Sequence, residues 1–253
     1  MNGSGKAARI TAIIPARMAS TRLPGKPLLD LCGKPIIQWV YERAAAAGCF
    51  DRVIVAAPDQ EILSAVAAFG GEAVLTSIEH RSGSDRIAEV CRGMDTGQII
   101  VNVQGDEPLL DPLAVARLAS TLAEDESILM GSLMRPLDES DDPDDPNLVK
   151  VVVDRYNFAL YFSRSRIPYV RDPGATARIY GHIGVYAYRR DFLLEFTSSP
   201  PTMLEKAESL EQLRALENGH RIKMIETNAR PVGVDTPEDL ERVRALISSG
   251  GIE

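Results

Sequence analysis

The first half of the chain alternates short apolar runs with segments of helical period. The apolar runs, each rich in Ile, Val or Ala, lie at residues 9–15, 52–57, 72–76 and 98–103. Segments with the spacing of amphipathic helices lie between them, at residues 35–47, 59–69 and 83–94. Strands that alternate with helices of roughly 10–15 residues predict right-handed crossovers and a mostly parallel central sheet flanked by helices.

The second half of the chain has a different rhythm, with strands that follow one another more closely. Strands are predicted at residues 127–136, 149–154, 159–163, 186–189 and 223–227, and helices at 204–217 and 236–247. We therefore expect a single α/β domain over residues 9–250. Within it, a smaller mixed or antiparallel extension is expected at about residues 127–190, and residues 1–8 are expected to form a mobile N-terminal tail.

Charge and cysteine content exclude several classes of protein. The 253 residues carry a formal net charge of −8, which is poorly suited to a nucleic-acid partner or an anionic membrane surface. Cys32, Cys49 and Cys91 show no CxxC spacing and indicate a reducing compartment. No stretch has the character of a signal peptide or of a membrane span of roughly 18 apolar residues. We expect a cytoplasmic protein with no nucleic-acid and no membrane partner.

The first predicted strand runs directly into a basic loop, PARMASTRLPGKPL, at residues 15–28. The loop contains Arg17, Arg22 and Lys26 and no acid, so its local charge is +3. Ligands of open α/β sheets bind beyond the carboxyl ends of the strands, and arginine and lysine neutralise phosphate oxygens well. The GxGxxG and GxxxxGK[ST] patterns are absent, which argues against a nicotinamide enzyme and a P-loop NTPase. The alternative is a solvated basic loop without a ligand.

Carboxylates follow another predicted strand, in the sequence Gln104-Gly105-Asp106-Glu107-Pro108. A carboxylate at a strand end suits a hard cation such as Mg²⁺, so we favour metal binding by Asp106 over capping of the next helix, for which Asp111 is better placed. Asp235 is a second isolated carboxylate before a predicted helix, and on spacing alone it could cap that helix or bind a metal. The spacing does not by itself bring Asp106 and Asp235 together.

Other segments hold dense polar side chains without a distinctive spacing. Arg164 follows an apolar strand, and taken alone it favours the protein surface. His182 and Tyr186 alternate with other side chains along a strand, which favours packing on a strand face. Glu211 and Gln212 lie within the helix predicted at 204–217 and would be assigned to its exposed face.

Six motifs follow one another over nearly the whole chain, from about residue 10 to residue 247. They read PARMASTRLPGKPL, VNVQGDEP, LYFSRSRIP, HIGVYAYR, SLEQLR and GVDTPEDLERV. Together they closely resemble the 3-deoxy-manno-octulosonate cytidylyltransferase family. The resemblance implies a nucleotide-diphospho-sugar transferase fold and a homodimer. It also implies an Mg²⁺-dependent reaction of CTP with 3-deoxy-D-manno-octulosonate (Kdo) that gives CMP-Kdo and diphosphate for lipopolysaccharide biosynthesis.

The resemblance also assigns roles to individual residues of this chain. The implied catalytic residues are Arg17, Arg22, Lys26, Asp106 and Asp235, of which Asp106 and Asp235 would be the Mg²⁺ ligands. The implied nucleotide-binding residues are Pro15, Ala16, Arg17, Lys26, Ser82, Gly83, Gln104 and Asp106. The implied sugar-binding residues are Arg22, Gln104, Arg164, His182, Tyr186, Glu211 and Gln212.

The chain departs from the usual family pattern at two places. Ala57-Pro58-Asp59 replaces the more usual Ala-Thr-Asp, which removes a hydroxyl but keeps the acid, and Ser84-Asp85 replaces the more usual Thr-Glu. Three alternative functions remain open at this point. The acceptor could be a related sugar acid, either 8-amino-Kdo or a sialic acid, or the chain could be a catalytically silent nucleotide-binding module.

Overall fold

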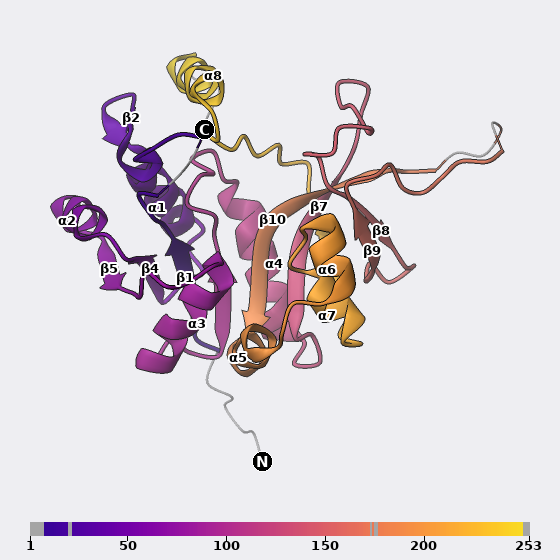
Figure 1. Cartoon of the computed structure of the whole chain (residues 1–253), viewed down its shortest axis with the longest axis horizontal. Helices are drawn as coiled ribbons and strands as arrows, with labels where there is room; N and C mark the ends of the chain where they lie inside the picture. The colour runs from indigo at the N-terminus through magenta and orange to yellow at the C-terminus, as the bar shows by residue number, and fades with distance from the viewer. Residues whose placement is uncertain (1–7, 20–21, 173, 175–176, 250–253) are drawn as a thin grey trace.

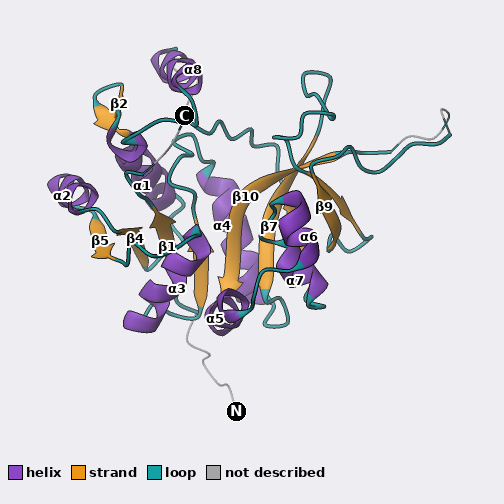
Figure 2. Ribbon diagram, viewed as in Figure 1, coloured by secondary structure: helices purple, strands orange, loops and turns teal. Residues whose placement is uncertain are grey.

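The structure, a computed structural model, describes residues 8–19, 22–172, 174 and 177–249. In this part of the chain a nine-stranded sheet carries helices on both faces (Figure 1, Figure 2). The predicted N-terminal tail lies outside the described residues, apart from Ala8.

The order of elements follows the predicted alternation of strands and helices. The first half contains β1 (Ile10–Pro15), the 3₁₀ helix η1 (Lys26–Leu28), β2 (Asp30–Leu31), β3 (Lys34–Pro35), α1 (Ile36–Ala46), β4 (Arg52–Ala57), α2 (Gln60–Ala68), β5 (Glu72–Leu75), α3 (Gly83–Gly93), β6 (Ile99–Asn102) and α4 (Pro112–Glu124). The second half contains β7 (Met130–Pro136), β8 (Lys150–Val153), β9 (Ala159–Ser163), β10 (Tyr180–Arg189), α5 (Arg190–Ser198), α6 (Met203–Glu208), α7 (Leu213–Glu217), β11 (Ile222–Glu226) and α8 (Pro237–Ser248).

The main path of the sheet has the strand order β11-β7-β10-β6-β1-β4-β5. β10 runs antiparallel to its neighbours β6 and β7, and the other neighbouring pairs on this path are parallel. The predicted mostly parallel α/β sheet is therefore confirmed. β8 and β9 form an antiparallel hairpin that pairs with the start of β10, and all three strands lie within residues 127–190, where antiparallel strands were expected.

Two apolar layers, one on each face of the sheet, explain why the strands of the first half hardly alternate. In β1, Ala12 and Ile14 pack in the layer that includes α1, α2, α4 and α8, whereas Ile13 packs in the layer that includes α3, α5 and α7. All three side chains are fully buried. A strand covered on both faces needs apolar side chains at consecutive positions, which is the pattern seen in the sequence.

The helices of the second half differ most from the sequence prediction. The single helix predicted over residues 204–217 is wrong, because α6 ends at Glu208 and Ser209 has a φ of 52°. The cause is a tertiary contact: Arg164 Nε donates to Glu208 O over 2.7 Å and Nη2 donates to Ser209 O over 3.3 Å. These donors satisfy carbonyls that the end of α6 leaves without helical partners. The helix expected after Asp111 is α4, which Asp111 caps as expected, whereas α5 is additional to the predicted helices.

The carboxyl ends of β1 and β6 open at one edge of the sheet, because these strands are parallel neighbours. The basic loop leaves β1 at this edge, and the segment with Asp106 follows β6. The chain between β11 and α8 crosses to the same edge, where Val234 N donates to Asp106 O over 2.9 Å (Figure 1). One edge of the sheet thus collects segments from the start, middle and end of the chain.

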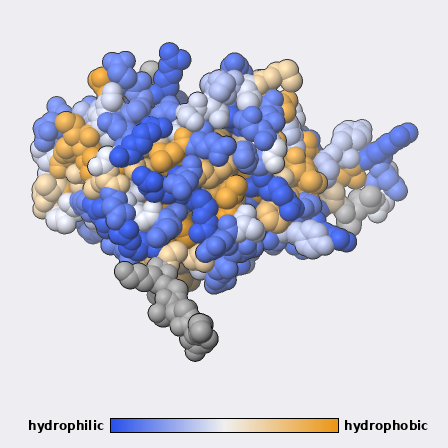
Figure 3. All heavy atoms as spheres, turned by 90° about the horizontal axis from the view of Figure 1, so that it is seen from below, coloured by the Kyte–Doolittle hydropathy of each residue, from blue (hydrophilic) through white to orange (hydrophobic). Residues whose placement is uncertain are grey.

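The lower face of the molecule has a different character. Seen from below it is mostly hydrophilic, with hydrophobic side chains between the polar ones (Figure 3). A broad hollow of about 900 Å³ is lined by four arginines and four carboxylates, which balance one another: Arg9, Arg92, Arg189 and Arg190 with Asp95, Glu126, Asp191 and Glu195. Among the helices of the described residues, none has the length and apolar character that a bilayer crossing needs.

Candidate active site

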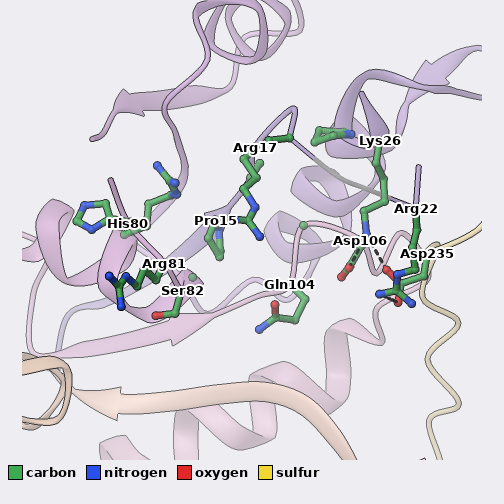
Figure 4. Close-up of a pocket in the computed structure, with 16 residues that line it drawn as sticks. Pro15, Arg17, Arg22, Lys26, His80, Arg81, Ser82, Gln104, Asp106 and Asp235 are labelled. Atoms are coloured by element: carbon green, nitrogen blue, oxygen red, sulfur yellow. Dashed lines mark hydrogen bonds and ion pairs between the residues drawn. The ribbon is translucent and has the colours of Figure 1, made fainter. Parts of the chain in front are cut away.

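A cavity of about 380 Å³ opens at the carboxyl edge of β1 and β6 (Figure 4). Its walls come from the basic loop, the start of α3, the segment after β6 and the chain before α8. The lining residues are Pro15, Ala16, Arg17, Ala19, Arg22, Lys26, Pro27, His80, Arg81, Ser82, Gly83, Arg86, Gln104, Gly105, Asp106 and Asp235. The structure therefore brings together every residue predicted to be catalytic and every residue predicted to bind the nucleotide.

Two contacts fix the shape of the basic loop. Gly25 N donates to Met18 O over 3.1 Å, and the φ of 70° at Gly25 favours glycine at that position. Asp59 Oδ2 accepts a hydrogen bond from Met18 N at 2.8 Å, although Asp59 stands where it could have capped α2. The acid retained beside Pro58 thus anchors the loop that carries Arg17 and Lys26 into the cavity.

The opposite wall carries cationic residues that the sequence analysis did not assign. Arg81 is exposed, whereas Arg86 is only 3% exposed and donates to Thr76 Oγ1 and Ser77 O. Burial, and then the like charge of Arg17, lowers the pKa of Arg86. His80 completes this wall and bonds to Glu89. Three basic residues within positions 80–86 were the available signal, and they make the cavity strongly favourable for an anion.

Asp106 and Asp235 meet at the other end of the cavity, where Lys26 joins them. Lys26 Nζ lies 2.8 Å from Asp106 Oδ2 and 3.0 Å from Asp235 Oδ1 (Figure 4). Arg22 Nη2 lies 3.0 Å from Asp235 Oδ2. Burial opposes the charge on Lys26, but its two carboxylate partners outweigh burial and raise the pKa of the ammonium group. The two carboxylates thus converge on one point, which their separation in the sequence did not reveal.

The role of helix cap falls to Thr236 rather than to Asp235. Thr236 Oγ1 accepts from Asp239 N over 3.2 Å, and the Asp239 carboxylate accepts from Thr236 N over 3.0 Å, so α8 begins with a capping box. The Asp235 carboxylate is left for Lys26 and Arg22. Asp235 therefore does not provide the side-chain cap of α8, and its role as a metal ligand stays a prediction.

The donor set at Asp106 and Asp235 fits a magnesium ion. Both side chains are partly exposed, 35% and 42%, and both already contact a cationic group. Within the described ranges, no cluster of three or more His, Cys, Asp or Glu side chains could hold a metal. Two carboxylates are nevertheless sufficient for Mg²⁺, which usually keeps several waters and takes further oxygens from a substrate phosphate.

Four polar residues lie close together next to the cavity, and we call them the β10 cluster: Gln104, His182, Tyr186 and Glu211. Gln104 also lines the cavity. Gln104 Nε2 donates to Gly184 O over 3.1 Å. On this face of β10, His182, Gly184 and Tyr186 are only partly buried, whereas the alternating residues on the other face lie in the core. Burial lowers the pKa of His182 to about 3 and raises the pKa of Tyr186, to which the Glu211 and Glu107 carboxylates contribute. The structure thus places these four residues, all predicted to bind the sugar, close to one another.

Glu211 is only partly exposed and Gln212 is buried, so their assignment to an exposed helix face is wrong. They lie in the break between α6 and α7, and Gln212 is only 3% exposed. Glu211 Oε2 accepts from Ser84 Oγ over 2.6 Å, and Glu211 Oε1 lies 3.5 Å from Arg214 Nη2. Burial raises the pKa of Glu211, against the effects of Ser84 and Arg214. In the described residues, Gln212 Nε2 is buried without a hydrogen-bond partner, so it is available to a ligand.

Arg164 is the predicted residue that the structure places apart. It does not line the cavity, and its guanidinium group donates to the carbonyls of Pro146, Glu208 and Ser209. The expectation that Arg164 is a plain surface residue is also wrong, because it joins the loop before β8 to the end of α6. In this structure Arg164 holds the chain just before Glu211 rather than facing the cavity.

Glu107 is a further residue of this region that the sequence analysis did not assign. Its Oε2 atom is buried and has no hydrogen-bond partner among the described residues. Burial, and then the neighbouring Asp106 carboxylate, raises the pKa of Glu107 to about 8. The sequence did not reveal that Glu107 lies near both Asp106 and Tyr186, because a surface position beside Asp106 was equally compatible with the pattern.

The parts of the site define a class of protein. An open α/β sheet presents a cavity rich in arginine and lysine that suits phosphates, and two carboxylates that suit a hard cation converge at one end of it. The polar β10 cluster next to the cavity offers hydrogen-bonding groups for an acceptor. This combination is that of a nucleotidyltransferase.

Comparison with known proteins identifies the family. A family profile described as Cytidylyltransferase matches residues 11–222. The 3-deoxy-manno-octulosonate cytidylyltransferase of Syntrophotalea carbinolica is 53% identical over 93% of this chain and 97% of its own, and that of Geobacter sulfurreducens is 52% identical over 92% and 97%. The solved structure of a CMP:2-keto-3-deoxy-manno-octonic acid synthetase complexed with CTP is similar at 45% identity, with a TM-score of 0.92 over 96% of this chain and 100% of that one. The chain belongs to the 3-deoxy-manno-octulosonate cytidylyltransferase family.

Proposed function

We propose that this protein joins CTP and Kdo to give CMP-Kdo and diphosphate, for lipopolysaccharide biosynthesis. The observation that carries the proposal is the meeting of Asp106 and Asp235, from distant parts of the chain, at one end of a cationic cavity. A protein that only binds nucleotides needs the cationic cavity but not the paired carboxylates. The names of the relatives supply the substrate pair, and the polar β10 cluster next to the cavity supplies hydrogen-bonding groups for a second substrate.

The nucleotide would occupy the cavity between the basic loop and α3. Its triphosphate would lie against Arg17 and Lys26, with Arg86 as an additional buried cation on the opposite wall. Ser82 and Gly83 would face the cytosine, and the backbone at Pro15 and Ala16 would approach the nucleotide from the end of β1. Charge neutralisation by arginine and lysine would hold the phosphates in a fixed position.

The sugar acid would lie against the β10 cluster, with Gln104 at the boundary between the two substrates. His182 and Tyr186 would contact it from β10, and Glu211 and Gln212 from the α6–α7 break, where Gln212 Nε2 is buried without a hydrogen-bond partner among the described residues. Arg22 would reach its carboxylate from the basic loop. Arg164 would contact the sugar only if its guanidinium group left the carbonyls that it now binds. We therefore assign Arg164 to positioning of the α6–α7 break rather than to contact with the substrate.

The reaction would be an in-line displacement at the α-phosphorus of CTP. The anomeric hydroxyl of Kdo attacks the phosphorus, its proton is lost to the surroundings, and diphosphate leaves with the electron pair of the broken P–O bond. Positioning and charge stabilisation carry most of the catalysis in such reactions. Arg17 and Lys26 would neutralise charge on the phosphates, and the residues of the β10 cluster would hold the attacking hydroxyl in line with the phosphorus.

We propose Mg²⁺ as the cofactor, with Asp106 and Asp235 as its protein ligands. When bound, the ion supplies Lewis-acid stabilisation of phosphate charge and favours ionisation of a nearby hydroxyl. We also propose a homodimer, on the resemblance of the chain to its family, and a cytoplasmic location. Cys32, Cys49 and Cys91 all remain as free thiols, which suits a reducing compartment.

The test is release of diphosphate with each nucleoside triphosphate and each candidate sugar acid. CTP with Kdo should give the fastest turnover, and a faster rate with 8-amino-Kdo or a sialic acid would reassign the acceptor. Asp106→Asn and Asp235→Asn should each lower turnover at saturating Mg²⁺ by at least about 100-fold. Asp191→Asn, at an exposed acid outside the cavity, is the matched control and should keep the rate. Full activity of both site variants would refute the metal assignment.

A further inference from the structure

Lys26 lies in the space between the two carboxylates that we assign to the metal. Its Nζ atom is within hydrogen-bond distance of an oxygen of each, 2.8 Å from Asp106 and 3.0 Å from Asp235. The Lys26 side chain is 14% exposed, less than either carboxylate. The ammonium group therefore serves as the shared counter-ion of this pair in the protein itself.

The charge of the pair is already balanced without a metal ion. Arg22 contacts the second oxygen of Asp235 at 3.0 Å, so two cationic side chains face two carboxylates. A divalent ion that bound both carboxylates would face the ammonium group of Lys26 across the same few ångströms, where like charges repel strongly. The ion and Lys26 thus compete for one position.

The backbone at Lys26 is well placed for an exchange that moves only the side chain. Lys26 begins η1, whose turn is closed by Leu28 N to Gly25 O at 2.9 Å and Leu29 N to Lys26 O at 3.2 Å, and Pro27 beside it is buried. The four-carbon stem of a lysine can reorient without disturbing such a turn. The neighbouring part of the same cavity, beside Arg17, is where the triphosphate would provide a new partner.

We propose that Lys26 is a resident counter-ion that keeps free divalent metal out of the site until a triphosphate takes its ammonium group. The proposal rests on the proposed function, since it takes Asp106 and Asp235 as the metal ligands. Under this proposal Lys26 sets the order of binding, because the protein binds the metal together with the nucleotide and binds the metal alone only weakly. Because such coupling is reciprocal, metal should strengthen CTP binding by the factor by which CTP strengthens metal binding.

The first experiment measures binding of Mn²⁺ to the full-length protein without nucleotide, from the free-ion EPR signal. Lys26→Gln should bind Mn²⁺ about tenfold more tightly than the unmodified chain, which corresponds to the loss of one competing ion pair. Lys26→Arg keeps the charge and should bind as weakly as the unmodified chain. Lys34→Gln is the matched control, because it breaks the Lys34–Glu42 ion pair outside the cavity and should change nothing.

Arg22→Gln provides a second variant in case Lys26→Gln does not fold, since Arg22 is 63% exposed. It should tighten Mn²⁺ binding by a smaller factor, because Lys26 remains. Unchanged or weaker Mn²⁺ binding by the folded Lys26→Gln protein, or by Arg22→Gln if Lys26→Gln does not fold, would overturn the proposal. That result is distinct from a failure of the proposed function, which would appear in the unmodified protein as an absence of diphosphate release from CTP and Kdo.

The second experiment measures CTP binding by calorimetry with and without Mg²⁺. In the unmodified protein Mg²⁺ should strengthen CTP binding, and in Lys26→Gln the strengthening should be smaller, because that variant has no ammonium group to release. Equal strengthening in the two proteins would contradict the exchange.

Discussion

His182, in the β10 cluster, shows how the surroundings of a single side chain change its pKa. Its Nε2 atom lies 2.8 Å from Ser132 Oγ, and its ring lies between Phe162 and Tyr186, with centroid distances of 5.0 and 5.4 Å. Burial lowers its pKa to about 3, so the ring is neutral at physiological pH. A neutral imidazole suits hydrogen bonding to sugar hydroxyls, since one nitrogen can donate while the other accepts.

The depressed pKa of His182 predicts a pH dependence of stability. An unfolded histidine has a pKa of about 6.5, above the folded value, so below about pH 6.5 the unfolded chain binds the extra proton first. Stability from this group is therefore fully present at neutral pH and is lost as the pH falls from about 6.5 toward 3. Between pH 7 and pH 5, His182→Asn should lose about 2 kcal/mol less free energy of unfolding than the unmodified protein. Urea titrations at both pH values check this, and parallel pH profiles would contradict it.

At the scale of residues, the sequence predicted the chemistry of the site better than its contacts. Arg17 and Asp106 could be assigned because a basic loop and a carboxylate each follow a buried strand, and strand ends share an edge. The pairing of Lys26 with Asp235 could not be predicted, because it depends on the path of the chain before α8. Arg86 was not assigned, since its position on α3 becomes informative only once burial is known.

The α6–α7 break shows the same limit at the scale of elements. The spacing of apolar residues over 204–217 is that of one helix. The hydrogen bonds from Arg164 to the end of α6 come from a distant part of the chain, so the local pattern cannot reveal them. The consequence is functional as well as structural. A continuous helix would turn Glu211 and Gln212 in another direction, whereas the break places the Glu211 carboxylate beside Ser84 and within the β10 cluster.

Ser209 at this break predicts a measurable backbone effect. Its φ of 52° lies in the left-handed region, which costs a non-glycine residue about 1 kcal/mol. Ser209→Gly should therefore raise the free energy of unfolding by about 0.5–1 kcal/mol, as judged from the urea midpoint. Ser199→Gly is the matched control at the end of α5, where φ is −78°, and it should lower stability. A gain at Ser199 equal to that at Ser209 would show that backbone conformation is not the cause.

At the scale of the whole molecule, the parallel half of the fold could be predicted from sequence and the antiparallel half only in outline. Strands such as β1 and β4 are buried on both faces, so consecutive apolar residues mark them clearly. β10 could be recognised only over residues 186–189, because its first part carries glycine and polar residues that are only partly buried. The direction of β10 follows from its antiparallel pairing with β6 and β7, and local periodicity does not encode that pairing.

The close approach of two segments at the edge of the sheet gives the last prediction. A Cβ atom on Gly105 would lie 2.7 Å from Pro15 O, so any larger residue would push the segment with Asp106 away from the end of β1. Gly105→Ala should lower turnover by at least about tenfold, because a displacement of about 1 Å in a catalytic group is costly, while the fold loses only about 1–3 kcal/mol. Gly93→Ala, where a Cβ would meet nothing within 4 Å, is the matched control and should leave turnover unchanged. Diphosphate release and thermal melting measured together separate the two effects. Equal turnover in the two variants would mean that contact between these segments does not set the position of Asp106.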